Sequence, residues 1–377
     1  MFIHLTEMDL PEFFNKKLRI KNMLLPVFIC TILLTCCHEA SREHTMMKSP
    51  AKTSHFFGDT VTQLGNNIMV VYHDSKNIYW FGSWETGLYK FNGKSIVHYT
   101  IKDGLPSNRI EEIKEDSNGN IFINTNAGLC QYDSNRIIKI QESLLQDSQW
   151  KLRHNDLWFK SPKPGFIYRY DGKSLHALKI PQCSIGEEYL SQHPKASDPY
   201  AIYCIYKDSK GNIWFGTALL GALRYNGKSF DWISESDVTE LHDGPANGVR
   251  SIVEDKDGYF WFNSEYRYKI LDMPVSKGEK FYERLKNIGS LDNKKDGDLK
   301  EYLSITRDYS NALWIATYRD GVWYYDGSRV THHAVQENGN NIHLFYIYTD
   351  TIGNIWLGTH ENGAWKYNGK IFHRFTP

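Results

Sequence analysis

Most of the chain consists of short apolar runs separated by turn residues, and one such pattern recurs. In each copy an apolar segment ends in Asp, a turn rich in Gly and Asn follows, and a strand such as Ile-Trp-Phe-Gly-Thr comes next. An aromatic strand, a turn such as Asn-Gly and a final strand complete the unit. Clear copies lie at residues 208–217 and 350–359, further copies at 74–83, 116–125, 255–264 and 308–317, and a weak copy at 156–159.

Each copy predicts four antiparallel strands. Asp and Gly favour tight turns, and Asn-Gly or Asp-Gly favours a two-residue hairpin. One aromatic position recurs at a mean spacing of about 46 residues, which is typical of four-stranded propeller blades. We expect these aromatic side chains to be core residues: Trp80, Phe122, Trp158, Trp214, Trp261, Trp314 and Trp356. The prediction is an all-β fold, a seven-bladed β-propeller with four antiparallel strands per blade at residues 61–377.

Ring closure has two possible forms. The last blade, whose fourth strand we place at 371–375, closes the ring by packing alone, or Phe56 and Phe57 add a strand from the N-terminal side. Residues 181–199 and 273–300 do not fit the repeat, and we expect them to be linkers.

The N-terminal segment has the pattern of a secretion signal. Basic residues at 16–21 precede an apolar run of about 13 residues, which is short for a membrane span and suits a signal peptide. The run ends in Leu-Thr-Cys-Cys, which resembles a bacterial lipobox, with Cys37 as the lipid-bearing residue and Cys36 as the alternative. We therefore expect a lipoprotein signal peptide at 1–36, a flexible tether at 37–60, and attachment to the membrane by a lipid anchor. A plain signal peptide or a short N-terminal anchor is the alternative.

Charge and composition narrow the function. Lys and Arg number 44 and so do Asp and Glu, so the chain lacks the basic excess that binding to nucleic acid requires. With 41% hydrophobic and 23% charged residues the chain is that of a folded protein. Aromatic residues make up 14%, which suits strands and saccharide-binding faces.

The repeat resembles the two-component regulator propeller repeat over nearly all of residues 61–377. The Gly-Leu-Pro-x-Asn element of that family is present at residues 104–108, with a partial echo at 244–247. The resemblance implies an extracytoplasmic sensor propeller of the kind found in hybrid two-component systems, where such propellers sense glycan fragments. The chain ends right after the last repeat, so we expect a stand-alone propeller without a kinase, located in the bacterial cell envelope and facing the periplasm or the cell surface.

The familiar catalytic and metal motifs are absent from the sequence. Gly-Lys-Ser recurs at hairpin turns without the spacing of a phosphate loop, and the Asp-rich turns lack the Glu that completes a calcium loop. No zinc spacing occurs among the 15 His. We therefore predict no cofactor and no metal site. Cys130 is expected to be a buried free thiol, and whether Cys183 and Cys204 form a disulfide is left open.

The loops that differ between repeats carry the candidate binding residues. In a propeller, the loops between second and third strands and those between successive blades gather around one mouth of the central channel. Aromatic rings beside carboxylates, guanidinium groups and amides suit a saccharide or a peptide. The candidate ligand-binding residues are Trp84, Glu85, Asn108, Arg109, Tyr266, Arg267, Tyr318, Arg319, Asp320, His360 and Glu361, with Asn247 beside them.

Three functions are compatible with this surface. The preferred one is recognition of a glycan, a peptide or an envelope protein partner. The second is an enzyme, since propellers resembling this one include lyases, and His360, Glu361 and Tyr318 could supply an acid and a base. The third is a structural scaffold that presents an apolar patch on the propeller rim. An enzyme requires titratable groups that converge in a pocket, whereas a glycan binder requires a flat aromatic platform.

Overall fold

The computed structural model describes residues 57–143, 150–193, 198–238, 248–263, 266–271, 280–286 and 302–377. The chain forms two units, residues 1–54 and residues 55–377, and the second holds all the described residues. The predicted signal peptide, both lipobox cysteines, most of the tether and Asn247 therefore lie outside the described residues. No helix within the described ranges is long and apolar enough to cross a membrane.

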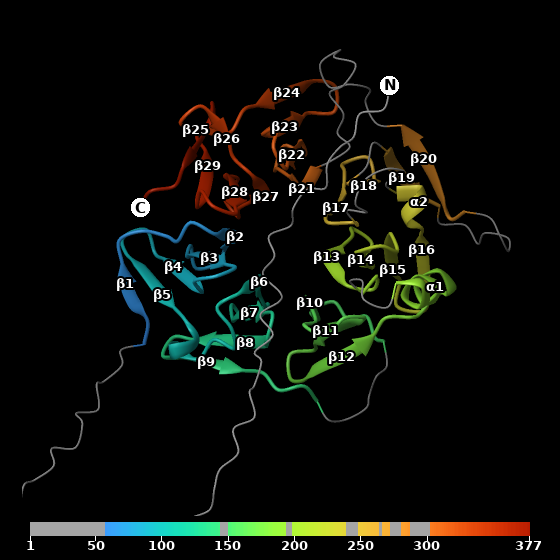
Figure 1. The fold of residues 1–377 in the computed structure, drawn as a ribbon, viewed down its shortest axis with the longest axis horizontal. Coiled ribbons are helices and arrows are strands. Elements are labelled where there is room, and N and C mark those ends of the chain that lie inside the picture. The colour runs from blue at the N-terminus through green and yellow to red at the C-terminus, as the bar shows by residue number, and fades with distance from the viewer. Residues whose placement is uncertain are drawn as a thin grey trace, which may run out of the picture. The chain divides into compact units, whose positions relative to one another are not determined.

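Seven antiparallel blades surround a common axis (Figure 1), which confirms the predicted β-propeller. Blade 1 consists of β2 (Ile68–His73), β3 (Tyr79–Ser83), β4 (Leu88–Phe91) and β5 (Ile96–Tyr99), and blade 2 consists of β6 (Ile110–Glu115), β7 (Ile121–Thr125), β8 (Gly128–Asp133) and β9 (Arg136–Lys139). Blade 3 consists of β10 (Leu157–Lys160), β11 (Phe166–Tyr170) and β12 (Leu175–Lys179). Blade 4 consists of β13 (Ile202–Lys207), β14 (Ile213–Thr217), β15 (Ala222–Tyr225) and β16 (Phe230–Ile233).

Blades 5 to 7 follow the same order. Blade 5 consists of β17 (Ile252–Glu254), β18 (Tyr259–Phe262), β19 (Tyr266–Ile270) and β20 (Tyr282–Lys286). Blade 6 consists of β21 (Tyr302–Arg307), β22 (Leu313–Thr317), β23 (Val322–Tyr325) and β24 (Val330–His333). Blade 7 consists of β27 (Leu344–Thr349), β28 (Ile355–Thr359), β29 (Ala364–Tyr367) and β30 (Phe372–Arg374). The remaining elements are β1 (Asp59–Val61), the hairpin β25 (Gln336–Glu337) and β26 (Asn340–Asn341), the 3-10 helix η1 (Ile101–Asp103), and the helices α1 (Ser184–Gln192) and α2 (Glu235–Val238).

The recurrent aromatic residues are buried at the same place in every blade, as predicted. Five of them are Trp residues whose indole N–H donates to the Asp six residues earlier, over 2.8–2.9 Å. In blade 4, Asp208 accepts the indole of Trp214 with one oxygen and the backbone amides of Lys210 and Asn212 with the other. This Asp thus stabilises both the turn and the buried Trp, and both of its carboxylate oxygens accept hydrogen bonds from within the blade.

Blade 3 departs from the four-stranded prediction. Its described residues form only β10, β11 and β12, so β10 takes the inner position between β6 and β13. The sequence of this copy also differs, because Leu152 stands where other copies have the Asp that accepts the indole. The indole nitrogen of Trp158 is buried without a partner. Nearby, Trp150 bridges two blades: its ring centre lies 5.8 Å from that of Trp158 in blade 3 and 4.7 Å from that of Phe230 in blade 4.

The ring closes by contact between blades 1 and 7. Ile68 of β2 pairs with Thr359 of β28, which joins the two blades into one sheet. Tyr79 of blade 1 donates a 2.7 Å hydrogen bond to Asp350 of blade 7. The N-terminal strand β1 pairs with β5 at the outer edge of blade 1 and takes no part in blade 7. Of the two forms considered, packing of the last blade closes the ring.

Both segments expected to be linkers contain regular structure. Helix α1 lies within residues 181–199, and β20, the outer strand of blade 5, lies within residues 273–300. Cys130 is buried, and burial raises the pKa of its thiol to about 12. Cys183 and Cys204 are free, so the disulfide left open by the sequence does not form in this structure.

Candidate functional site at the mouth of the central channel

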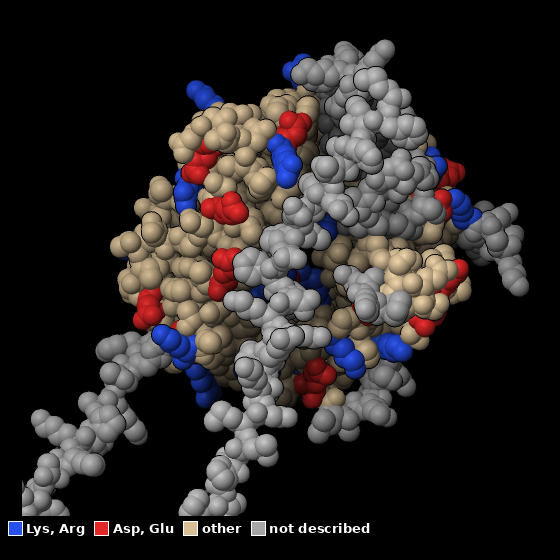
Figure 2. All heavy atoms as spheres, in the orientation of Figure 1, with Lys and Arg blue, Asp and Glu red and all other residues tan. Residues whose placement is uncertain are grey.

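The inner strands enclose a cavity of about 740 Å³ along the propeller axis. All seven blades contribute to its wall, and Figure 2 shows basic side chains inside the hollow at the centre of the face in view. Cavities of 300–1,000 Å³ are typical of small-molecule sites. The cavity is therefore large enough to hold a ligand of a few sugar or peptide units.

Aromatic side chains from three blades meet at the mouth of this cavity, and Phe345 is their common neighbour. Its ring centre lies 6.3 Å from that of Trp84, 5.3 Å from that of Tyr318 and 5.7 Å from that of His360. His343 stacks on Tyr318 at 4.6 Å with an angle of 10° between the rings. We call these five residues the mouth cluster. Their rings lie at several angles, so they do not form the flat platform expected of a glycan binder.

The repeat motif itself fixes the loops that carry this cluster. Trp84, Tyr318 and His360 each directly follow the last residue of a second strand, which is Ser or Thr. In blade 6 the hydroxyl of Thr317 accepts the amide of Asp320 over 2.9 Å and donates to the carbonyl of Gly321 over 2.9 Å. Thr359 closes the loop of blade 7 in the same way. The side chain after this residue therefore projects from a rigid turn.

Charged side chains from the start of blade 2 and from β10 adjoin the mouth cluster. The guanidinium of Arg109 lies over the ring of Trp84 at 4.1 Å and its Nε donates to Glu111 over 2.6 Å. The ammonium of Lys160 lies 3.1 Å from the other oxygen of Glu111. Burial acts to raise the pKa of Glu111, but Lys160 and Arg109 outweigh it and hold that pKa below its usual value. Glu111 is thus a carboxylate held between two cations.

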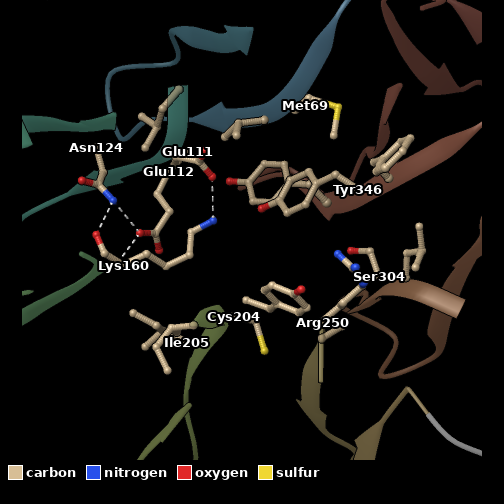
Figure 3. Close-up of a pocket in the computed structure, with 18 of the residues that line it drawn as sticks. Met69, Glu111, Glu112, Asn124, Lys160, Cys204, Ile205, Arg250, Ser304 and Tyr346 are labelled. Carbon is tan, nitrogen blue, oxygen red and sulfur yellow. Dashed lines mark hydrogen bonds and ion pairs between the residues drawn. The ribbon is translucent and has the colours of Figure 1, made fainter. Parts of the chain in front are cut away.

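Side chains of blade 2 cover the open edge of β10 (Figure 3). Glu112 accepts the backbone amide of Lys160 over 2.6 Å, and the amide group of Asn124 donates to the carbonyl of Lys160 over 2.8 Å and to Glu112 over 3.0 Å. Lys114 donates to the carbonyl of Trp158 and pairs with Glu112 at 3.2 Å. These bonds replace the ladder that the inner strand of blade 3 would provide, since edge groups left unpaired and buried are unfavourable.

Four predicted residues lie together at the mouth: Trp84, Arg109, Tyr318 and His360. Arg319 lies over the ring of Tyr318 at 5.2 Å. The side chains of Glu85, Arg319, Asp320 and Glu361 are exposed on the same set of loops.

The other predicted residues have different surroundings. Asn108 accepts the backbone amide of Ile101 over 2.9 Å and so shapes the loop before blade 2. Tyr266 and Arg267 lie in β19, where Arg284 of β20 covers Tyr266 at 4.3 Å and Arg267 lies over Tyr259 at 4.6 Å. The structure therefore does not bring Tyr266 and Arg267 to the mouth cluster.

Sequence reasoning missed Phe345, His343, Glu111, Lys160, Arg250 and Tyr203. One signal was available, because Asn124 and Asn263 stand where the clearest copies have Gly216 and Gly358. Asn124 fixes the backbone of Lys160, and Asn263 accepts the backbone amide of Arg250 over 2.9 Å. Phe345 and His343 lie at the start of an inner strand, a segment that the repeat pattern leaves variable.

The proposed acid and base residues are near one another without forming one reactive group. His360 and Glu361 approach to 3.8 Å, while Phe345 packs against the rings of both His360 and Tyr318. In the described part of the chain no hydrogen bond joins Tyr318 to His360 or Glu361, and no three His, Cys, Asp or Glu side chains are grouped so that they could hold a metal ion.

Comparisons with known proteins support the repeat assignment. A family model described as two component regulator propeller matches residues 197–218 and 243–266. A search of curated proteins gives no match.

Solved structures with the same architecture include the extracellular domain of BT4673 from B. thetaiotaomicron, at 20% identity and a TM-score of 0.54 over 86% of this chain and 41% of that chain. Virginiamycin B lyase from Staphylococcus aureus has 14% identity and a TM-score of 0.56 over 81% of this chain and 96% of that chain. The chain spans about two fifths of the length of the B. thetaiotaomicron domain. These similarities show the fold, a seven-bladed β-propeller, and the family model assigns two component regulator propeller repeats to the two matched stretches of the chain.

Proposed function

We propose that this chain is an extracytoplasmic propeller that binds and senses a saccharide at the mouth of its central channel. The observation that carries the proposal is the mouth cluster around Phe345, which opens into a cavity of about 740 Å³ lined by Trp84, Arg109 and Phe345. Aromatic surface beside charged groups and amides provides stacking and directional hydrogen bonds, which saccharide recognition needs.

The shape of the site favours a small ligand over a flat protein surface. The rings of Trp84 and Phe345 meet at 56° and those of Tyr318 and Phe345 at 84°, and Trp84 and Phe345 also line the cavity. A short saccharide could enter this cavity beside the rings, while a peptide or an envelope protein would contact mainly the exposed loops. The similarity to extracellular domains of bacterial sensor systems agrees with a sensing role.

The cell envelope is the proposed location. The secretion signal at 1–36 and the lipobox at Cys37, with Cys36 as the alternative, support a lipid anchor on the periplasmic or outer face of a membrane. A partner protein of the envelope would then read the bound state of the propeller.

A glycan array combined with thermal-shift measurements on the purified full chain tests this function. We expect at least one saccharide to raise the melting temperature of the wild type and to lose this effect in Phe345→Ala. The matched control is Tyr309→Ala, because Tyr309 is 69% exposed and lies in a turn at the opposite ends of the strands. Absence of any saccharide effect, together with capture of an envelope protein by the same surface, would overturn the proposal.

A further inference from the structure

The cavity carries a local charge that the whole chain lacks. The chain is neutral overall, with 44 basic and 44 acidic side chains. The charged residues that line the cavity are Arg109, Lys114, Lys160 and Arg250 against Glu111 and Glu112. A low-dielectric cleft with an excess of one sign of charge attracts ligands of the opposite sign.

The two carboxylates are already committed to three of these cations. Arg109 and Lys160 hold Glu111 at 2.6 and 3.1 Å, and Lys114 lies 3.2 Å from Glu112. All of these groups lie on the side of the cavity formed by blades 2 and 3, whereas Arg250 lies across from them beside Ser304 (Figure 3). The four cations exceed the two carboxylates by two charges, one within the group on blades 2 and 3 and one on Arg250, and among the described residues only Arg250 has no carboxylate paired with it.

Arg250 is held in place by its backbone and by an aromatic ring, and no carboxylate of the described residues pairs with its guanidinium. Its backbone amide donates to Asn263 over 2.9 Å, and its guanidinium lies over the ring of Tyr203 at 4.4 Å. Its Nε is buried with no hydrogen-bond acceptor, and no ion pair of Arg250 occurs among the residues that the structure describes. Arg250 lines the cavity, so a ligand that enters it meets a positive charge that no carboxylate of the described residues balances.

We propose that the ligand is an acidic saccharide and that Arg250 binds its carboxylate; this inference rests on the proposed saccharide function. A guanidinium presents parallel N–H groups that match the two oxygens of a carboxylate. The same cavity is lined by Trp84 and Phe345 at its mouth, which suit the apolar faces of sugar rings. A uronic-acid oligosaccharide combines both features, and its acid group would enter the cavity while its neighbouring sugars contact the mouth cluster.

Calorimetric titration of the full chain tests the inference. The probes are uronate trisaccharides built from galacturonate, mannuronate or glucuronate, each paired with its methyl ester, in which the sugar is unchanged and the charge is removed. We expect at least one acid to bind at least tenfold more tightly than its ester to the wild type. Arg250→Gln should abolish this preference, Arg250→Lys should retain part of it, and added salt should weaken binding of the acid more than binding of the ester.

The outcomes separate the inference from the function on which it rests. If neutral saccharides bind as well as acidic ones, or Arg250→Gln weakens the acid and the ester equally, the acidic ligand is refuted and the saccharide function stands. If no saccharide binds the wild type, the proposed function fails as well. Because Arg250→Gln could unfold the chain, its melting temperature is compared with the wild type, and Arg250→Lys decides the matter if the Gln variant is unstable.

Discussion

The carboxylate of Glu112 accepts a 2.6 Å hydrogen bond from the backbone amide of Lys160, and so one blade completes the inner edge of the next. Blade 3 has no inner strand among its described residues, and this side chain takes the place of a backbone partner. The same arrangement places Lys160 beside Glu111 in the cavity wall. The hydrogen bonds that satisfy the open edge of blade 3 and the charge of the cavity therefore depend on the same residues.

Removing the Glu112 carboxylate should destabilise the protein. Glu112→Ala leaves the amide of Lys160 and the amide group of Asn124 without this acceptor, and a loss of about 1–3 kcal/mol in the free energy of unfolding is expected. Glu112→Gln keeps an acceptor oxygen and should lose less. Urea denaturation measures both, with Glu361→Ala as the exposed control. Equal stability of Glu112→Ala and the control would show that β10 needs no such cap.

Acid should loosen the contact between the first and last blades. Burial acts to raise the pKa of Asp350, but hydrogen bonds from Asn354, Trp356 and Tyr79 hold it below the usual value. A carboxyl with a lowered folded-state pKa stabilises the fold above its unfolded pKa of about 3.9, and this contribution is lost as the pH falls through the folded value. Melting temperatures should therefore fall below about pH 4 more steeply in the wild type than in Asp350→Asn. Parallel pH profiles of the two proteins contradict this role.

The cysteines should differ in reactivity. Burial raises the pKa of both Cys130 and Cys204 to about 12, so neither forms appreciable thiolate at pH 8. Cys183 and Cys204 are both half-buried as residues, so the raised thiol pKa of Cys204 is what sets it apart. In the native protein at pH 8, iodoacetamide should alkylate Cys183 first, as peptide mass spectrometry would show. A Cys183–Cys204 disulfide, seen as a loss of two hydrogen masses, would contradict the free thiols.

Lipid attachment can be tested directly on the lipobox. Growth with a labelled fatty acid should label the wild type, and Cys37→Ser should remove the label and release the protein from the membrane fraction. Cys36→Ser is the matched control and should keep the label. Label that persists in Cys37→Ser but is lost in Cys36→Ser would assign the anchor to Cys36, and absence of label in the wild type would refute the lipoprotein.

The repeat was readable from the sequence because five of the seven copies use the same Asp and Trp for the same purpose. The Asp that closes the turn also accepts the indole six residues later, as with Asp208 and Trp214, so spacing and residue type are fixed together. Blade 3 was harder to predict because Leu152 removes that Asp and the segment no longer carries the pattern. The sequence therefore predicts the number of blades better than the strands of each blade.

The site was only partly predictable for a related reason. Trp84 and Tyr318 stand in variable loops directly after a fixed Ser or Thr, and their placement follows from the repeat. Phe345 lies near the start of β27 and Arg250 lies two residues before β17, and they line the same cavity as Trp84 only because the blades form a ring. Tyr266 also follows a second strand in the sequence, yet it belongs to β19 and contacts Arg284 instead of the mouth.

Titration of a saccharide found by the array into wild-type protein, Phe345→Ala and Tyr309→Ala is the most direct test of the central claim. Because Phe345 contacts Trp84, Tyr318 and His360, its removal should weaken binding at least tenfold while the melting temperature of the free protein stays well above the assay temperature. Tyr309→Ala should bind as the wild type does. Unchanged affinity in Phe345→Ala would contradict a ligand site at the channel mouth.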